Sequence, residues 1–274
     1  MSCASVVQKA LRPVKVCHIP YRVPYGIGLQ LQEHLVNRRA KARAVLREAA
    51  IPVHEQNRHG LSPEMQRHLD VAQTDVLLLL EHTPVYTLGR RSDQAAMGAI
   101  LAAPHVDIFQ TKRGGLLTYH GPGQLVGYPI LDLCLMNLST RCYVAKMQTF
   151  LRNVLSRKEI NVPTIESPSE DSKYTGVWTD PTRKIASIGV QVRHRVTSHG
   201  FGLNVHNEAL EGFRKVVACG LPDVQLTSID EQLLKLGRSS TLSLHDVACI
   251  AADEFGLTMG RSMEDADDAF IHVV

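Results

Sequence analysis

The chain has 274 residues, of which 44% are hydrophobic and 21% charged, enough to bury a large core in one sizeable domain or two small ones. Its formal net charge of +3 argues against a nucleic-acid-binding protein with a dominant cationic face. No apolar run approaches the length that spans a bilayer, and the six cysteines and thirteen histidines lack the close pairs of metal sites. We therefore expect no nucleic-acid partner, no membrane span, no metal and no cofactor.

The N-terminal region is basic and contains no acid. Residues 1–32 include Lys9, Arg12, Lys15 and Arg22 but neither Asp nor Glu. Such a composition is typical of mitochondrial transit peptides, although an ordinary basic first strand would look the same. We expect residues 1–13 to be a short targeting segment and the protein to be mitochondrial, with the cytoplasm as the alternative.

The first half of the chain predicts a helix, an insertion and a buried strand. Apolar residues at helical spacing indicate a helix over 28–36. Residues 37–73 are basic and include Pro52 and Pro63, which predicts a helical extension and an exposed loop, inserted at the surface. The run 76–80 is continuously apolar and predicts a strand buried on both faces. Residues 113–133 predict strands joined by tight turns.

The second half predicts further helices and one alternating strand. Val144, Met147, Leu151, Val154 and Leu155 form one apolar helical face. Residues 184–192 alternate as a strand does. The last two expected helices are bounded by polar caps and glycines, with Ser228 and Ser243 as N-caps and Gly237 and Gly256 at the ends. The pattern predicts a single α/β (α+β) domain over 14–274, a mixed sheet flanked by helices, with a helical C-terminal extension from about residue 240.

A glycine-rich stretch at 113–124 is the first candidate for chemistry. The spacing of Gly121, Gly123 and Gly127 imitates a dinucleotide-binding turn, but such a turn must open a helix. The following residues read as a strand and include Pro129, so we reject that interpretation. The stretch can bring backbone N–H groups close to a ligand, or it can be a pair of ordinary hairpin turns.

Cys219 and Lys184 are the candidate reactive side chains. Cys219 lies in Val-Val-Ala-Cys-Gly-Leu-Pro, where the following glycine frees the backbone, so its thiol could attack a thioester or a carbonyl. Most single cysteines are inert core residues, which remains the alternative. Lys184 begins a strand, where a lysine is either a solvated end residue or, in a pocket, a partner for a thiolate or carboxylate.

In this order, these segments resemble the lipoyl(octanoyl) transferase family, often called LipB. The matching stretches are Arg-Gly-Gly-Leu-Leu-Thr-Tyr-His-Gly-Pro-Gly-Gln at 113–124 and its continuation to 133, Lys-Ile-Ala-Ser-Ile-Gly-Val at 184–190, His-Gly-Phe-Gly-Leu-Asn-Val at 199–205 and Ala-Cys-Gly-Leu at 218–221. The similarity runs from about residue 74 to 232. It implies the fold of the biotin and lipoate protein ligase catalytic domains.

The resemblance also implies roles for these residues. Cys219 would accept the octanoyl group of octanoyl-acyl carrier protein as a thioester, and Lys184 would activate the thiol. A lysine of a lipoyl domain, in a 2-oxoacid dehydrogenase subunit or the glycine-cleavage H protein, would then displace Cys219 and form an amide. Backbone N–H groups of the glycine-rich stretches are hypothetical oxyanion donors. The residues expected to bind substrate are Arg113, Gly114, Gly115, Leu116, Leu117, Thr118, Tyr119, His120, Ser187, Ile188, Gly189, Gly200, Phe201 and Gly202.

Three other functions remain open. An ATP-dependent lipoate or biotin protein ligase shares the implied fold but forms an acyl-adenylate and needs no nucleophilic cysteine. A non-catalytic binder of acylated carrier domains would use the same pocket without turnover. A thioesterase would use the same cysteine with water as the acceptor. Cys219 and Lys184 together favour the transferase, which we expect to be a monomer.

Overall fold

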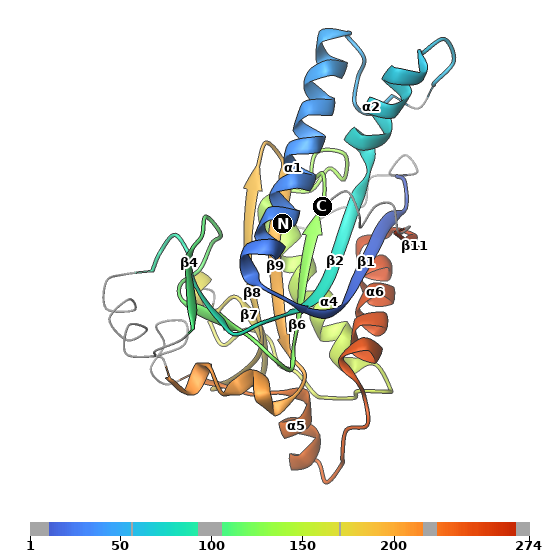
Figure 1. Ribbon diagram of the computed structural model, residues 1–274. Coiled ribbons are helices and arrows are strands. Elements are labelled where there is room, and N and C mark those ends of the chain that lie inside the picture. Colours follow the sequence, from blue (N-terminus) through green and yellow to red (C-terminus); the bar gives the residue numbers. More distant parts are fainter. Residues whose placement is uncertain (1–10, 56, 93–105, 170, 216–223, 267–274) are drawn as a thin grey trace.

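A large mixed β-sheet runs through the centre of the protein, with helices on both faces (Figure 1). The computed structural model describes residues 11–55, 57–92, 106–169, 171–215 and 224–266. Within these residues the sheet has eight strands in the order β10-β8-β9-β6-β2-β1-β11, with β7 also paired to β8. The strands are β1 (Val14–Val23), β2 (Asp75–His82), β6 (Gln124–Ile130), β7 (Gly176–Asp180), β8 (Arg183–Arg193), β9 (Val196–Asn204), β10 (Gln225–Leu226) and β11 (Met263–Asp265).

Parallel and antiparallel pairs share this sheet, which confirms the predicted α/β fold. Strand β1 is parallel to β2 and β11, and β10 is parallel to β8, whereas the pairs from β2 through β6 and β9 to β8 are antiparallel. Strand β2 contains the predicted run 76–80 and is buried on both faces, as expected. Leu77 and Leu79 face one hydrophobic core, and Val76, Leu78 and Leu80 face another.

Helices α4 (Thr140–Ser156) and α6 (Leu244–Met259) cover one face, and α1 (Tyr25–Glu48) covers the other (Figure 1). The predicted α4 face is confirmed except that Tyr143 is buried there, while Val144 is half-buried. Helix α6 lies within the region of the expected C-terminal extension, and its Phe255 is fully buried in the main core. The Phe255 ring lies edge-on to Phe150 of α4, with ring centroids 5.3 Å apart.

Most of the predicted helix ends are confirmed. Ser228 caps α5 (Ile229–Lys235), Ser243 forms a capping box with Asp246, and Gly237 follows α5 with a φ of +68°. The prediction for Gly256 is wrong, because α6 continues to Met259 and ends at Gly260. A Cβ on Gly256 would lie 2.7 Å from Met263 Cγ, so close packing against the returning chain explains this glycine.

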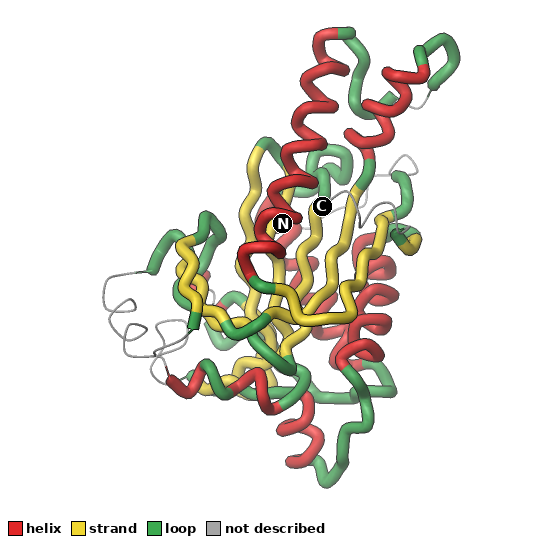
Figure 2. The backbone as a smooth tube through the Cα atoms, in the orientation of Figure 1, coloured by secondary structure: helices red, strands yellow, loops and turns green. Residues whose placement is uncertain are grey.

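Helix α1 and the following helix α2 (Pro63–Gln73) extend beyond the sheet as a pair (Figure 2). The predicted helix 28–36 begins three residues earlier, at Tyr25, and its predicted helical extension is confirmed to Glu48, but α2 lies where an exposed loop was expected. Pro63 occupies the first helical turn, where proline is tolerated, and Ser62 caps the helix by accepting a hydrogen bond from Met65 N at 3.2 Å. The pair has its own small apolar cluster, formed by Ala42, Leu46, Leu69 and Ala72.

A small second sheet lies beside the large one, and the glycine-rich stretch leads into it. Its described strands run in the order β4 (Asp107–Gln110), β3 (Val85–Leu88), β5 (Thr118–His120). A tight turn with Gly123 at a φ of +80° joins β5 to β6, as the sequence predicted for 113–133. This turn carries the polypeptide from the small sheet to the large one.

The terminal predictions are only partly covered by the structure. Most of the predicted targeting segment 1–13 lies outside the described residues. Among the helices that the structure describes, none is long and apolar enough to cross a membrane.

Candidate active site

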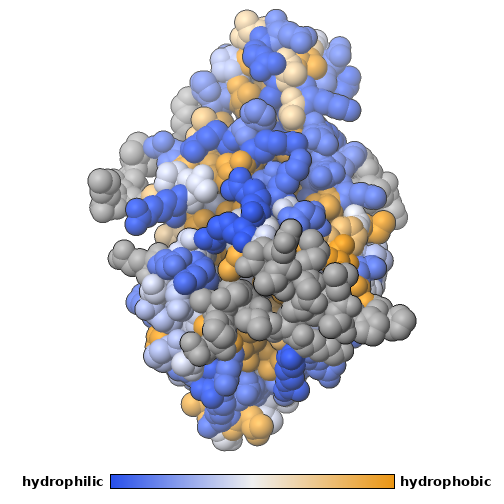
Figure 3. Space-filling model, turned by 90° about the vertical axis from the view of Figure 1, so that its left-hand side faces the viewer, coloured by the Kyte–Doolittle hydropathy of each residue, from blue (hydrophilic) through white to orange (hydrophobic). Residues whose placement is uncertain are grey.

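A pocket lies between the small sheet and strands β8 and β9. Its cavity volume is about 60 Å³, so it is a narrow cleft that opens to solvent. It brings together the predicted residues Arg113, Gly115, Leu116, Leu117, Thr118, His120, Lys184, Ser187, Ile188, Gly189, Gly200, Phe201 and Gly202. Figure 3 views the protein from the side of the small sheet, where hydrophilic side chains dominate the described surface.

Three predicted residues are not placed in the pocket. Alternation along β5 directs Thr118 and His120 toward it, whereas the Tyr119 ring packs 5.3 Å from that of Tyr86 on the other side. The N–H of Gly114 donates to Val190 O at 2.9 Å, so it ties the glycine-rich loop to β8 and is not available as an oxyanion donor. Cys219 lies outside the described residues.

Arg113 organises the glycine-rich loop from inside. The side chain is buried, and Nη2 donates to both Thr87 O and Thr87 Oγ1 at 2.7 Å. Nη1 donates to Gly114 O at 3.0 Å. A Cβ on Gly189 would lie 3.2 Å from Arg113 Cδ, so this glycine leaves room for the arginine. The result is a rigid cationic wall on one side of the pocket.

Two buried histidines, His120 and His199, line the pocket, and a third, His82, packs against His120 with ring centroids 5.9 Å apart. Burial lowers the pKa of His82 to about 4 and, with the Arg113 charge, that of His199 to about 4. Burial, together with the nearby His82, lowers the pKa of His120 to about 3. Because these values lie far below neutrality, all three rings are uncharged at physiological pH.

A chain of side-chain hydrogen bonds fixes the tautomer of His120. Asn204 Nδ2 donates to the backbone carbonyl of Thr227 at 2.9 Å, and Asn204 Oδ1 accepts from Gln124 Nε2 at 2.9 Å. Gln124 Oε1 then accepts from His120 Nδ1 at 2.6 Å. Because the Thr227 carbonyl can only accept, the chain runs in one direction and the proton of His120 is on Nδ1. Nε2 therefore carries a lone pair.

The same reasoning assigns the hydroxyl of Tyr128. His82 Nδ1 donates to the carbonyl of Val23 at 2.7 Å, so its Nε2 must accept from the Tyr128 hydroxyl at 2.7 Å. Burial raises the pKa of Tyr128 well above its ordinary value and that of Tyr25 to about 12, so both phenols stay protonated. These contacts line the inner pocket with neutral, oriented polar groups.

Lys184 is buried at the start of β8, with 1% of its surface exposed. Nζ donates to the carbonyls of Thr175 at 3.3 Å and Lys173 at 3.4 Å, and lies 4.8 Å from the centroid of the Trp178 ring. Lys184 thus lies in the pocket rather than at a solvated strand end. This confirms the pocket alternative for its position, while its chemical role stays a prediction.

Sequence reasoning missed several lining residues, which are Tyr25, Arg91, Tyr128, Ser172, Lys173, Thr175 and His199. Tyr128 and His199 belong to the quoted motifs, but they read as ordinary strand residues. The positive φ of His199, +55°, has no sequence signal. Tyr25 comes from the first turn of α1, and nothing local connects it to the pocket.

The described residues contain no group of three or more His, Cys, Asp or Glu side chains that could hold a metal ion. The arrangement in the pocket is instead one buried lysine, one buried arginine, neutral histidines and an apolar wall. Such a set can bind an acyl chain, hold a carbonyl group and stabilise an anion beside the lysine.

Comparisons with known proteins show the fold and the family of this chain. The fold matches lipoate-protein ligase A bound with ATP, with a TM-score of 0.58, 11% identity and coverage of 95% of this chain and 92% of that chain. It also matches a bi-partite lipoate protein ligase from Thermoplasma acidophilum, with a TM-score of 0.53, 11% identity and coverage of 96% and 90%. The model of the lipoyl protein ligase A/B catalytic domain matches residues 59–256, and the chain belongs to this family.

The sequence relatives define the branch of the family. An octanoyltransferase of Koribacter versatilis is 41% identical over 189 residues, covering 66% of this chain and 70% of the relative. Octanoyltransferases of Caldicellulosiruptor bescii and Frankia casuarinae are 40% and 36% identical over 193 residues, covering 69% and 70% of this chain and 79% and 85% of the relatives. The predicted LipB family and acyltransferase class are confirmed.

Proposed function

We propose that this enzyme transfers an octanoyl group from octanoyl-acyl carrier protein to a lysine of a lipoyl domain, through a thioester on Cys219. The observation that carries the proposal is the convergence of Lys184, the Arg113 loop and an apolar wall on one pocket, in a chain about 40% identical to octanoyltransferases. The named relatives support octanoyl transfer. The carrier-protein donor and the cysteine intermediate are our proposals.

The first half-reaction is a thioester exchange. The sulfur of Cys219 attacks the carbonyl carbon of the octanoyl thioester, a new C–S bond forms, and the bond to the carrier sulfur breaks. The proton of the Cys219 thiol passes to the departing carrier thiolate. Lys184 would stabilise the Cys219 thiolate and help to move this proton.

The second half-reaction forms the amide. The neutral amine of the acceptor lysine attacks the Cys219 thioester, a C–N bond forms, and the C–S bond breaks. One proton of the amine returns to the sulfur of Cys219, which restores the thiol. An amide is more stable than a thioester, so transfer is downhill and needs no ATP.

The environment of the pocket suits an acyl group. Leu116, Leu117, Ile188 and Phe201 offer apolar contacts to an alkyl chain. The neutral state of His120 adds no charge that would have to be desolvated when an apolar chain enters. A filled pocket would also keep water away from the thioester and favour aminolysis over hydrolysis.

The decisive experiment is intact-mass analysis after incubation with octanoyl-carrier protein in the absence of ATP. We expect the wild type to gain one octanoyl group and to lose it when a lipoyl domain is added, whereas Cys219→Ser gains none. Acylation of the lipoyl domain only with ATP and free octanoate would establish a ligase instead. Discharge of the adduct without an acceptor lysine would indicate a thioesterase.

The acceptors that we propose are lipoyl domains of 2-oxoacid dehydrogenase subunits and the glycine-cleavage H protein. A mitochondrial location and a monomeric state stay predictions. Import of a fusion of residues 1–32 to a fluorescent reporter, and the solution mass of the purified enzyme, would test them.

A further inference from the structure

Lys184 is held by a neighbouring segment as well as by its own strand. The carbonyls of Lys173 and Thr175 accept hydrogen bonds from Nζ, and both belong to the turn around the short 3-10 helix η1 (Ser172–Tyr174). This turn leads directly into β7, which pairs with β8. The segment 173–178 therefore encloses the end of the Lys184 side chain, and we call it the lysine cradle.

Gly176 provides the space through which the Lys184 side chain passes. A Cβ on Gly176 would lie 3.2 Å from both Cδ and Cε of Lys184 and 2.5 Å from the carbonyl oxygen of Ala186. Its φ of +153° is also one that other residues rarely adopt. Any side chain at this position would therefore push Lys184 or β8 away.

Trp178 is fixed independently of the lysine. Its side chain is fully buried, and its indole Nε1 donates to the carbonyl of Tyr174 at 2.9 Å. The pairing of β7 with β8 shifts on both sides of Trp178, and such irregularities redirect a side chain. The ring lies beneath Nζ of its cross-strand partner Lys184, with 4.8 Å between the nitrogen and the ring centroid.

We propose that the lysine cradle holds the ammonium group of Lys184 in its working position. Trp178 acts as a positioning residue, and Gly176 leaves the space that the methylene groups of the Lys184 side chain occupy. The two carbonyls and the indole face are all acceptors for a cation. The cradle matters for catalysis only if Lys184 takes part in transfer, so this part of the inference rests on the proposed function. An indole that only filled the core would need no cation over its face.

Substitutions at Trp178 separate the aromatic face from the filled volume. Trp178→Phe keeps a smaller aromatic ring, whereas Trp178→Met fills the core with a flexible side chain that has no ring. We expect the rate of Cys219 acylation to fall roughly 3-fold in Trp178→Phe and roughly 10-fold or more in Trp178→Met. The proposal would be overturned if the acylation rate fell equally in both variants. It would also be overturned if the fall in rate only followed each variant's loss of stability.

The pH profile of acylation gives a readout that a purely structural role would not change. Without the indole face the ammonium form loses a stabilising contact, so the alkaline limb of the rate profile should move to lower pH in Trp178→Met. Among the described residues, the other ionisable groups that line the pocket are Arg91, Arg113, Lys173, Tyr25, Tyr128, His120 and His199. All of them remain in the variant, so an unchanged limb would contradict the cradle.

Fluorescence tests the contact itself, without any assumption about the reaction. Trp178 is the single tryptophan of the chain, so emission reports on this site alone. We expect the alkaline titration of the emission to contain a step that is missing in Lys184→Met, which retains every tyrosine. Identical titrations would overturn the cradle even if octanoyl transfer were observed. A lysine-dependent step without any acylation would instead refute the proposed function and leave the contact in place.

Gly176→Ala tests whether the space at Gly176 is needed by the Lys184 side chain. We expect it to abolish the lysine-dependent emission step and to reduce acylation as strongly as Lys184→Met does. The matched control is Gly26→Ala, where the added Cβ would meet Phe109 at an ordinary 3.5 Å. A Gly176→Ala variant that is folded by circular dichroism and retains both the step and the rate would disprove the role of Gly176.

Discussion

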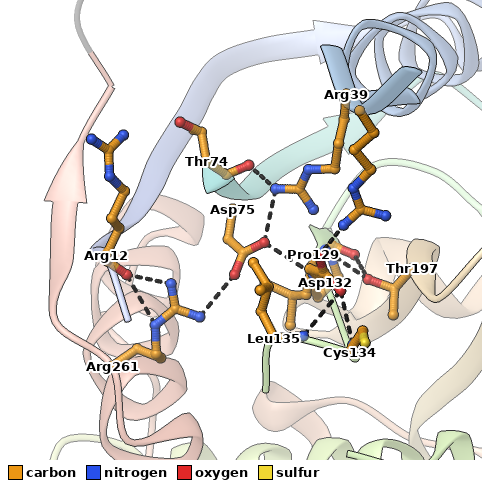
Figure 4. Close-up of polar contacts among 12 residues, drawn as sticks. Arg12, Arg39, Thr74, Asp75, Pro129, Asp132, Cys134, Leu135, Thr197 and Arg261 are labelled. Carbon is orange, nitrogen blue, oxygen red and sulfur yellow. Dashed lines mark hydrogen bonds and ion pairs between the residues drawn. The ribbon is translucent and has the colours of Figure 1, made fainter. Parts of the chain in front are cut away.

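The two ends of β2 carry buried polar groups of opposite character. At its first residue lies the Asp75 cluster, formed by Asp75, Asp132, Arg39, Arg43 and Arg261 (Figure 4). At its last residue, His82 leads into the neutral histidines of the pocket. Strand β6 runs antiparallel beside β2; its Tyr128 bonds to His82, and Asp132, just after the strand, bonds to Asp75. The same two strands thus support a cluster of matched ion pairs at one end of β2 and neutral histidines at the other.

In the Asp75 cluster, charges are matched and the groups tie distant elements together. Asp75 Oδ1 accepts from Arg39 Nη2 at 2.8 Å and from Asp132 N at 3.0 Å, and Oδ2 accepts from Arg261 Nη1 at 2.8 Å. Burial alone would raise the pKa of Asp75, but Arg39 and Arg261 hold it below its usual range. The carboxylate therefore stays charged and joins α1, the segment after β6 and the segment after α6.

For the three histidines, burial lowers the pKa values without an opposite charge that would compensate for it. Three histidines have strongly lowered pKa values, and the rings of His82 and His120 bond to a carbonyl, a phenol and an amide rather than to carboxylates. The contrast shows two solutions to the cost of burying polar groups. Ion pairs join α1, β2 and the segment after α6, whereas His82 and His120 are held by neutral hydrogen-bonding partners.

The largest predicted effect is on the Asp75 cluster. Asp75→Asn removes the negative charge but keeps the shape, leaving Arg39 and Arg261 buried beside an amide. We expect the free energy of unfolding to fall by about 3–5 kcal/mol, because breaking a buried pair leaves charges uncompensated. Urea denaturation followed by circular dichroism would measure this. A loss below about 1 kcal/mol would mean that the two guanidinium groups find other partners.

The next effect concerns the chain that orients His120. Gln124→Leu would leave His120 Nδ1 and Asn204 Oδ1 without their partners. We expect acylation of Cys219 to slow by roughly 10- to 100-fold, as for a misplaced active-site group, with a modest loss of stability. The control is Gln66→Leu, where the amide only donates to Leu61 O in the α1–α2 pair. An unchanged rate in Gln124→Leu would remove His120 orientation from the mechanism.

The third predicted effect is a dependence of the free energy of unfolding on pH. His199 has an ordinary pKa of 6.5 when unfolded and about 4 when folded, so below pH 6.5 the unfolded state binds the extra proton. Stability should therefore fall with acid between about pH 6 and 5, and His199→Gln should reduce this slope by about 1 kcal/mol per pH unit. Asp75 would add its own loss only at lower pH. Exposed His59→Gln is the control, and an equal slope in wild type and His199→Gln would contradict the assignment.

Local sequence signals predicted what depends on local physics. The sequence predicted the continuous apolar run of β2, the serine caps of α5 and α6 and the turn at Gly123. Periodicity, capping and backbone freedom each act over a few residues, so a local pattern reveals them. The resemblance to a known family supplied most of the pocket, since its motifs lie on β5, β8 and β9.

The errors arose where contacts between distant residues decide the structure. Arg261 and Asp75 are 186 residues apart, and neither residue type in isolation indicates burial. Gly256 is a glycine because of Met263, and Tyr25 joins the pocket only through the docking of α1. Such contacts have no periodicity, so single-sequence reasoning has no signal for them.

The smallest predicted effect concerns an exposed ion pair, which shows whether burial or charge pairing makes the Asp75 cluster important for stability. Lys15 Nζ and Glu264 Oε1 form an ion pair at 2.9 Å across β1 and β11, but the Glu264 side chain is 54% exposed. Because water and salt screen such a pair, Glu264→Gln should cost only about 0.2–1 kcal/mol in the same urea experiment. A loss as large as that of Asp75→Asn would show that charge at this edge of the sheet matters regardless of burial. A small loss would leave burial as the property that makes the Asp75 cluster essential.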